Sequence, residues 1–335
     1  MGLADNFVAA LAETSGVATN PYLAHTTRLL QRLEAEAATD PILAHYVGKL
    51  EKRVGKVNFA LDPGATNEFL QLLGEAHFYS MALQRGVQLE RVAEAEESRP
   101  DFKYTENGLE LFFEVKTLSV VDGELGIRAA LKSSFEARLS IEHQLRIGRP
   151  VATAVSTIQP FAGRPYAHGM VRGVIGTLIE KARQNVKKGQ FELGRTFLVL
   201  NLSLLGLTNV AKNLRPILWE THPSPTPVTG YLWTTAFGEI DYLVHGVPEF
   251  EGRPGVEGKL EKQGILNESK YIQGLLLLNQ LFDRDAMLSA LLRSSEQADW
   301  EDQGLPINSL LSMLVGNLWN NDLDSNGFRL DVEDP

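Results

Sequence analysis

An alternating segment at residues 109–118 is the strongest constraint on the fold of this chain. Alternate side chains of a strand project from opposite faces. One face comprises Leu109, Leu111, Phe113 and Val115, and the other comprises Glu110, Phe112, Glu114 and Lys116. The segment therefore predicts a strand with an apolar face in the core and a second face that carries an acidic and a basic side chain.

The segments around this strand alternate between helical and extended patterns. Asp62-Pro63 is typical of a helix start, and the apolar stripe that follows predicts a helix that ends at Gly86. Helices are predicted over 64–85, 126–147 and 169–188, and strands over 87–93, from Asp101, over 109–118, over 150–158 and over 195–205. This order predicts an α/β fold with a mixed β-sheet flanked by helices.

The regions outside this core are assigned separately. Pro21 and Pro41 mark the starts of two helices, so residues 1–60 are predicted to form an N-terminal helical arm. Residues 61–205 form the predicted core, and residues 206–335 form a C-terminal α+β extension packed on it, with one continuous domain as the alternative. The extension is expected to contain strands at 230–237 and 272–278, loops at 223–227 and 249–264, and an irregular tail from residue 319.

Composition narrows the class of protein. The 335 residues include no cysteine, which excludes disulfides, thiolate metal ligands and cysteine nucleophiles. There is no run of about 18 apolar residues and no secretory signal pattern, so no membrane span is expected and cytoplasmic localisation is predicted. The net charge of −10 weighs against a surface that coats nucleic acid, but it allows binding through one basic patch.

Charged residues stand at the start of the strand predicted from Asp101 and near the end of the strand predicted over 109–118. Asp101 follows Pro100, and Glu114 and Lys116 leave the same face of their strand, about 7 Å apart along it. Carboxylates of this kind suit Mg²⁺ or Mn²⁺, and the backbone carbonyl of Val115 would add a third ligand. A lysine there can orient or help deprotonate an attacking water and stabilise a pentavalent phosphate.

These motifs resemble those of the restriction-endonuclease-like PD-(D/E)xK superfamily. The resemblance is carried by GEAHFYSMALQRG, then PDF, then LFFEVKT, in the order helix glutamate, Pro-Asp and Glu-x-Lys. The motifs cover residues 64–118, and the order of elements extends the resemblance to residue 205. It implies a restriction-endonuclease-like core and a metal-dependent nuclease.

The resemblance also implies roles for individual residues. Asp101, Glu114 and Lys116 would be catalytic, with Asp101 and Glu114 as metal ligands. Glu75, on the helix before them, would be an auxiliary ligand. Glu68, one heptad earlier on the same border of the apolar stripe, is the alternative, and the family spacing favours Glu75.

In this superfamily a basic or glutamine side chain on a core helix often contacts the scissile phosphate. Lys181 and Gln184, one turn apart on the helix at 169–188, are the candidates. The helix at 126–147 competes with it, because that helix directly follows the third strand; its polar side chains include Arg128, Lys132, Arg138 and Gln144.

The sequence therefore predicts a metal-dependent phosphodiester hydrolase that uses Mg²⁺ or Mn²⁺ and acts on nucleic acid, with DNA as the first choice. Cleavage of both strands of a duplex by one site per chain would favour a homodimer. Two alternatives stay open. One is a catalytically inactive binding or scaffold protein on the same fold, which the acidic net charge favours. The other is a different metal-dependent hydrolase that acts on small phosphate esters.

Overall fold

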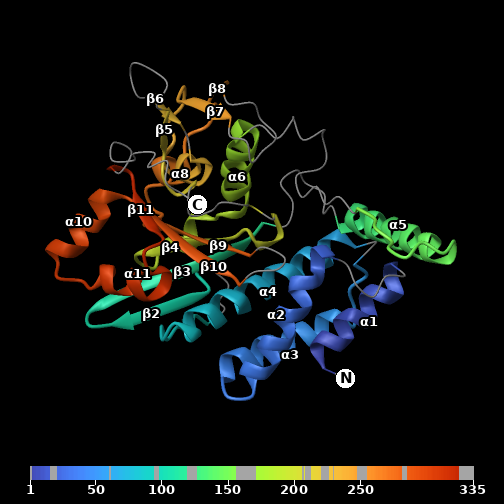
Figure 1. Cartoon of the computed structure of the whole chain (residues 1–335). Helices are drawn as coiled ribbons and strands as arrows, with labels where there is room; N and C mark the ends of the chain where they lie inside the picture. The colour runs from blue at the N-terminus through green and yellow to red at the C-terminus, as the bar shows by residue number, and fades with distance from the viewer. Residues whose placement is uncertain are drawn as a thin grey trace.

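A computed structural model gives the fold of the chain (Figure 1). It describes residues 2–15, 21–59, 62–93, 98–118, 127–155, 171–205, 207, 213–219, 226–228, 230–246, 255–280 and 285–323. The fold is α/β, with a mixed seven-stranded sheet and helices on both of its faces, as the sequence predicts.

The central sheet has the strand order β1-β2-β3-β4-β9-β10-β11. β1, β2 and β3 are antiparallel neighbours, and β3, β4 and β9 are parallel. β10 is antiparallel to β9, and β11 is parallel to β10. The bounds are β1 (Glu90–Arg91), β2 (Phe102–Glu106), β3 (Leu109–Thr117), β4 (Thr196–Asn201), β9 (Gly274–Asn279), β10 (Met287–Leu292) and β11 (Trp319–Asn321). The strands of the predicted core and of the C-terminal extension thus belong to one sheet.

One face of the sheet is covered by helices from both ends of the chain. These are α1 (Leu3–Ser15), α2 (Pro21–Ala37), α3 (Pro41–Val54), α4 (Pro63–Gln84), α10 (Ser294–Asp302) and α11 (Ile307–Val315). Their apolar residues form one buried cluster with Leu111, Phe113 and Val115 of β3. The predicted helices in 21–54 and at 64–85 are confirmed, and α1 is an additional helix within the region predicted as an N-terminal helical arm.

α6 (Val171–Asn185), α8 (Tyr231–Phe237) and α9 (Ile265–Glu268) cover the opposite face. The apolar stripe of α6 is buried, as its periodicity predicts, and it packs in one cluster with Leu198 and Leu200 of β4. The short turns η1 (Lys188–Phe191) and η2 (Ser203–Leu205) precede and follow β4. Two hairpins lie outside the main sheet: β5 (Ile217–Trp219) with β6 (Thr226–Val228), and β7 (Leu243–Gly246) with β8 (Gly255–Lys259).

α5 (Ile127–Arg146) confirms the helix predicted over 126–147. It projects to one side of the molecule, where it contacts α1 (Figure 1). None of the helices within the described ranges is long and apolar enough to cross a membrane.

Residues 231–237 form helix α8, so the strand predicted at 230–237 is wrong. All seven residues of the helix are buried, and the Thr235 hydroxyl donates a hydrogen bond to the Tyr231 carbonyl at 2.7 Å. Aromatic and β-branched residues favour a strand when considered locally. Here they fill the space between α6 and α9, where a short buried helix satisfies its own backbone.

Other predicted segments differ from the structure in extent. Residues 150–155 form no strand, since the position beside β3 is taken by β4; residues 156–158 lie outside the described residues. The strand at 87–93 shortens to β1. β6 overlaps the loop expected at 223–227, and β8 lies within the loop expected at 249–264; each is the second strand of an antiparallel hairpin. β11 lies in the expected irregular tail, where it pairs with β10. Residues 223–225, 249–254 and 324–335 of these segments lie outside the described residues.

Candidate active site

The candidate site lies where β2 and β3 part. Phe102 of β2 pairs with Phe113 of β3, and the Asp101 N–H still donates to the Phe113 carbonyl at 3.0 Å. β2 does not extend beyond this point, whereas β3 continues to Thr117. The backbone groups of β3 that would pair with a longer β2 therefore need other partners.

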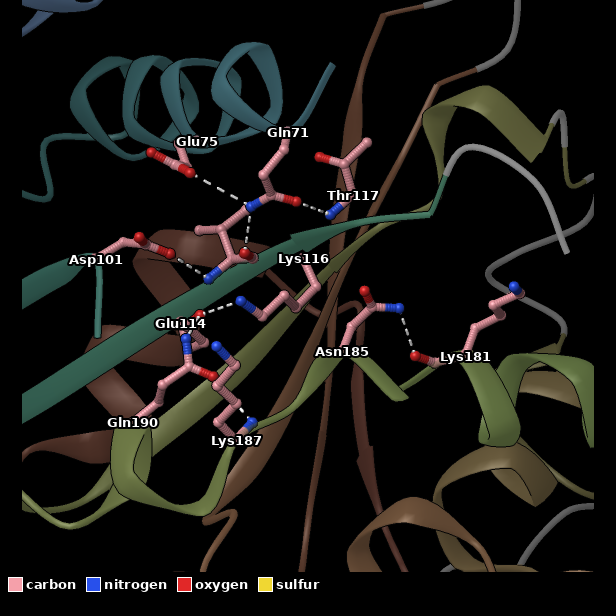
Figure 2. Close-up of polar contacts among 11 residues, drawn as sticks. Gln71, Glu75, Asp101, Glu114, Lys116, Thr117, Lys181, Asn185, Lys187 and Gln190 are labelled. Atoms are coloured by element: carbon pink, nitrogen blue, oxygen red, sulfur yellow. Dashed lines mark hydrogen bonds and ion pairs between the residues drawn. The ribbon is translucent and has the colours of Figure 1, made fainter. Parts of the chain in front are cut away.

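Two side chains supply these partners (Figure 2). The Asp101 Oδ2 atom accepts a hydrogen bond from the Val115 N–H at 2.7 Å. The Gln71 amide, on α4, donates to the Val115 carbonyl at 2.7 Å and accepts from the Thr117 N–H at 2.8 Å. Asp101 and Gln71 thus complete the free edge of β3, and the carbonyl predicted as a metal ligand is hydrogen-bonded to Gln71.

Glu114 and Lys116 project from the face of β3 that is turned towards α6 and η1. They pair with Leu198 and Leu200 of β4, which belong to the α6 cluster. The Lys116 Nζ lies 2.5 Å from the Glu114 Oε1, and the side chains are 18% and 1% exposed, respectively. The amide of Gln190 also donates to Glu114 Oε1 (Figure 2). The second oxygen, Oε2, is buried and has no hydrogen-bond partner.

Glu75 approaches from α4, on the other side of β3 from Lys116 (Figure 2). Its carboxylate accepts a hydrogen bond from the Tyr46 hydroxyl at 3.2 Å and from the Gln71 amide at 3.3 Å. Glu68, the alternative on the same helix, is instead an exposed residue that pairs with Arg53 at 2.5 Å. The structure therefore brings Glu75, and not Glu68, to the end of β3.

Burial and electrostatic interactions raise the pKa values of all three carboxyls. Burial, followed by repulsion from Asp101, raises the pKa of Glu75 to about 8. Burial and then the charge of Glu114 raise the pKa of Asp101 above its usual range. Burial also raises the pKa of Glu114, against the opposing pull of Lys116. Burial is the largest cause in each case, so each carboxyl holds its proton more tightly than it would in water.

Across the described residues, no three His, Asp or Glu side chains gather into a group ready to hold a metal ion. Each of the three carboxylates is turned towards its own protein partner. The donor set is nevertheless composed of hard oxygen atoms of the kind that Mg²⁺ prefers. Glu114 Oε2 is the one of these oxygens that is buried without a hydrogen bond, so Glu114 fits the role of a metal ligand.

The predicted phosphate contacts are placed differently. In Figure 2 the Lys181 side chain extends away from Glu114. Gln184 is exposed and donates to Glu180 at 3.0 Å. On the competing helix α5, Arg138 pairs with Glu142 and Gln144 binds the Thr153 carbonyl, while the side chains of Arg128 and Lys132 lie outside the described part. The structure brings none of the described candidates to the carboxylates.

Three residues that the sequence did not indicate hold the site together: Tyr46, Gln71 and Gln190. Gln71 stands four residues before Glu75, on the same side of α4, and this spacing is a signal that was available in the sequence. Tyr46 and Gln190 come from α3 and η1, far from their partners in the chain, and no local pattern marks them.

Comparison of the chain with protein-family models, with curated proteins and with solved structures gave no match.

Proposed function

We propose that this protein is a metal-dependent nuclease with a restriction-endonuclease-like core, acting on DNA. The observation that carries the proposal is that Glu75, Asp101 and Glu114 interact electrostatically with one another and with Lys116 at the free end of β3, and that Glu114 Oε2 is buried without a hydrogen bond. Buried carboxylates with raised pKa values beside one lysine are typical of functional sites. The order of α4, β2 and β3 matches the order of the motifs that carry the resemblance, helix glutamate, Pro-Asp and Glu-x-Lys.

The chemistry is divided among the residues of the site. A divalent cation, when bound, neutralises charge on the phosphate and makes a coordinated water more acidic. Asp101 and Glu114 would hold it, Glu75 would complete the ligand set, and the Val115 carbonyl would join them by exchanging its bond from Gln71. Lys116 would orient the attacking water, or take its proton when the amine is neutral, and as a cation it would stabilise the charge that develops on the phosphoryl oxygens.

Cation binding on this proposal requires the carboxylates to turn from their present partners. Asp101 would share its contact with the Val115 N–H, and Glu75 would share its contacts with Tyr46 and Gln71. These are rotations of side chains whose backbone is already in place. A cation favours such a rotation, because its charge would offset both the burial of these carboxylates and the repulsion among them.

Mg²⁺-dependent cleavage of DNA by the purified chain tests the proposal. We expect Asp101→Asn and Lys116→Ala each to reduce cleavage by at least about 10²-fold, the effect of removing one group that acts in the transition state. Lys103→Ala is the matched control, since Lys103 pairs with Glu110 across β2 and β3 at 2.5 Å, outside the site. Cleavage that survives Asp101→Asn would overturn the assignment.

Two further outcomes separate the alternatives. Turnover of small phosphate esters without cleavage of DNA or RNA would indicate a different metal-dependent hydrolase. Calorimetry that detects no Mn²⁺ or Mg²⁺ binding to the wild-type chain would exclude the metal-dependent mechanism and favour a scaffold function on this fold.

A further inference from the structure

Gln190 is a buried polar residue in η1, between α6 and β4, and it is only 7% exposed. Both ends of its amide are used. The Oε1 atom accepts a hydrogen bond from the Lys187 N–H at 3.0 Å, and the Nε2 group donates to Glu114 Oε1. The two partners lie 3 and 76 residues away in the chain. Gln190 therefore joins a local turn to the candidate active site.

The local turn accounts for only one of these two contacts. The acceptor atom of Gln190 closes the turn at Lys187, and an apolar side chain of similar length could fill the same buried space. A buried amide group without a partner destabilises a protein. Glu114 is the partner that makes an amide donor acceptable at this position.

The contact fixes Glu114 in a particular way. Oε1 receives hydrogen bonds from both Lys116 and Gln190, whereas Oε2 receives none. One oxygen is thus anchored, and the other is buried without a hydrogen bond. Because the amide is neutral, it orients the carboxylate and leaves the negative charge in place. A second lysine would neutralise that charge.

We propose that Gln190 is the positioning residue for Glu114, holding it so that Oε2 is available to a divalent cation. This inference rests on the proposed function, because it assigns the open oxygen to the cation. Residues that orient metal ligands typically contribute about 10- to 100-fold to metal affinity. Gln190 acts through Glu114 and does not itself contact the cation or the substrate.

Mn²⁺ binding to Gln190→Met, measured by calorimetry on the full chain, tests this role. Methionine has a similar length and no donor, so we expect the dissociation constant for Mn²⁺ to rise about 10- to 100-fold. The Mg²⁺ concentration needed for half-maximal cleavage should rise in parallel, while the rate at saturating Mg²⁺ falls much less. A purely structural role would lower the thermal stability and leave metal affinity unchanged.

Gln297→Met is the matched control. Gln297 also donates to a carboxylate, that of Glu301 at 3.2 Å, but on α10 and outside the site. It should leave the Mn²⁺ affinity at the wild-type value. If Gln190→Met does not fold, Gln190→Asn is the second variant. The shorter asparagine side chain cannot reach Lys187 and Glu114 together, so weaker Mn²⁺ binding is again expected.

The outcomes distinguish this inference from the proposed function. If the wild-type chain binds Mn²⁺ and cleaves DNA, and a folded Gln190 variant binds Mn²⁺ equally well, the positioning role is wrong and the nuclease proposal stands. If the wild-type chain neither binds Mn²⁺ nor cleaves nucleic acid, the proposed function fails, and this inference fails with it.

Discussion

Glu75, Asp101 and Glu114 are residues whose charge is unfavourable in the folded chain without a cation. Their pKa values are raised, first by burial in each case. A carboxyl with a raised pKa binds its proton more tightly in the folded than in the unfolded chain, so the free energy of unfolding falls as pH rises. For Glu75 this contribution is complete below pH 4.5 and is lost as the pH passes about 8.

Glu75→Gln should reduce this pH dependence. The substitution removes the titrating group but keeps the side-chain length and an acceptor for Tyr46. In metal-free buffer we expect the wild-type free energy of unfolding to fall between about pH 5 and about pH 8, and to fall less in Glu75→Gln. Urea denaturation at several pH values measures the difference. Glu68→Gln, an exposed carboxylate on the same helix, is the control, and parallel curves for Glu75→Gln and wild type would refute the prediction.

The predictability of each site residue depends on how local its signal is. Asp101, Glu114 and Lys116 lie within 16 residues of one another on a strand pair whose alternation is visible in the sequence. Glu75 follows from helix periodicity together with the motif order. Tyr46 and Gln190 reach the site only through the packing of α3 and η1, which no periodicity specifies. The packing of α6 likewise decides where Lys181 points, and Lys181, chosen through the resemblance, extends away from Glu114.

At the scale of elements, the short distance between α4 and the sheet determines the positions of Gln71 and Glu75. A Cβ atom on Gly74, between these two residues, would lie 1.9 Å from Thr117 Oγ1 and 2.8 Å from Asn201 Nδ2. Glycine therefore allows α4 to lie close to the ends of β3 and β4. A helix held further away would withdraw Gln71 from the free edge of β3.

Gly74→Ala and Gly48→Ala should change stability in opposite directions. Alanine is favoured over glycine within a helix by about 1 kcal/mol, and nothing lies within 4 Å of a Cβ at Gly48 of α3. We therefore expect Gly48→Ala to raise the free energy of unfolding by about 0.5–1 kcal/mol. Gly74→Ala should lower it by about 1–3 kcal/mol, because the contact forces α4 from the sheet.

Urea denaturation of both variants measures these changes, and cleavage assays on the same samples report on the site. Stabilisation of the chain by Gly74→Ala would show that α4 does not depend on this close approach.

Elements with long, regular patterns were predicted well, and short buried ones were not. α6 and β3 each carry a periodicity over nine or more residues. α8 has seven residues, all buried, so it shows no polar face from which a helical period could be recognised. β11 has three residues, and its assignment depends on pairing with β10. An element that is buried on every side has no polar face, so its sequence shows no alternation of polar and apolar residues from which its type could be predicted.

At the scale of the whole molecule, the sheet joins the two halves of the chain. The inner strand β9, from the C-terminal region, has all six residues buried. Leu276 and Leu278 join the cluster on the α4 face, and Leu275 and Leu277 join the cluster on the α6 face. Arg85, after α4, donates a hydrogen bond to the Leu314 carbonyl of α11. Neither cluster is complete without strands from beyond residue 205.

The chain should therefore unfold as one cooperative unit. All four tryptophans, Trp219, Trp233, Trp300 and Trp319, lie after residue 205, so their fluorescence reports on the C-terminal region, whereas far-UV circular dichroism reports largely on the helices, most of which precede it. We expect the two signals to give coincident urea transitions.

A fragment of residues 1–205 lacks β9 and leaves an apolar edge at β4, so it should aggregate or show no cooperative transition. Separate transitions in the full chain, together with a cooperatively folded fragment, would instead show that residues 1–205 are an independent domain.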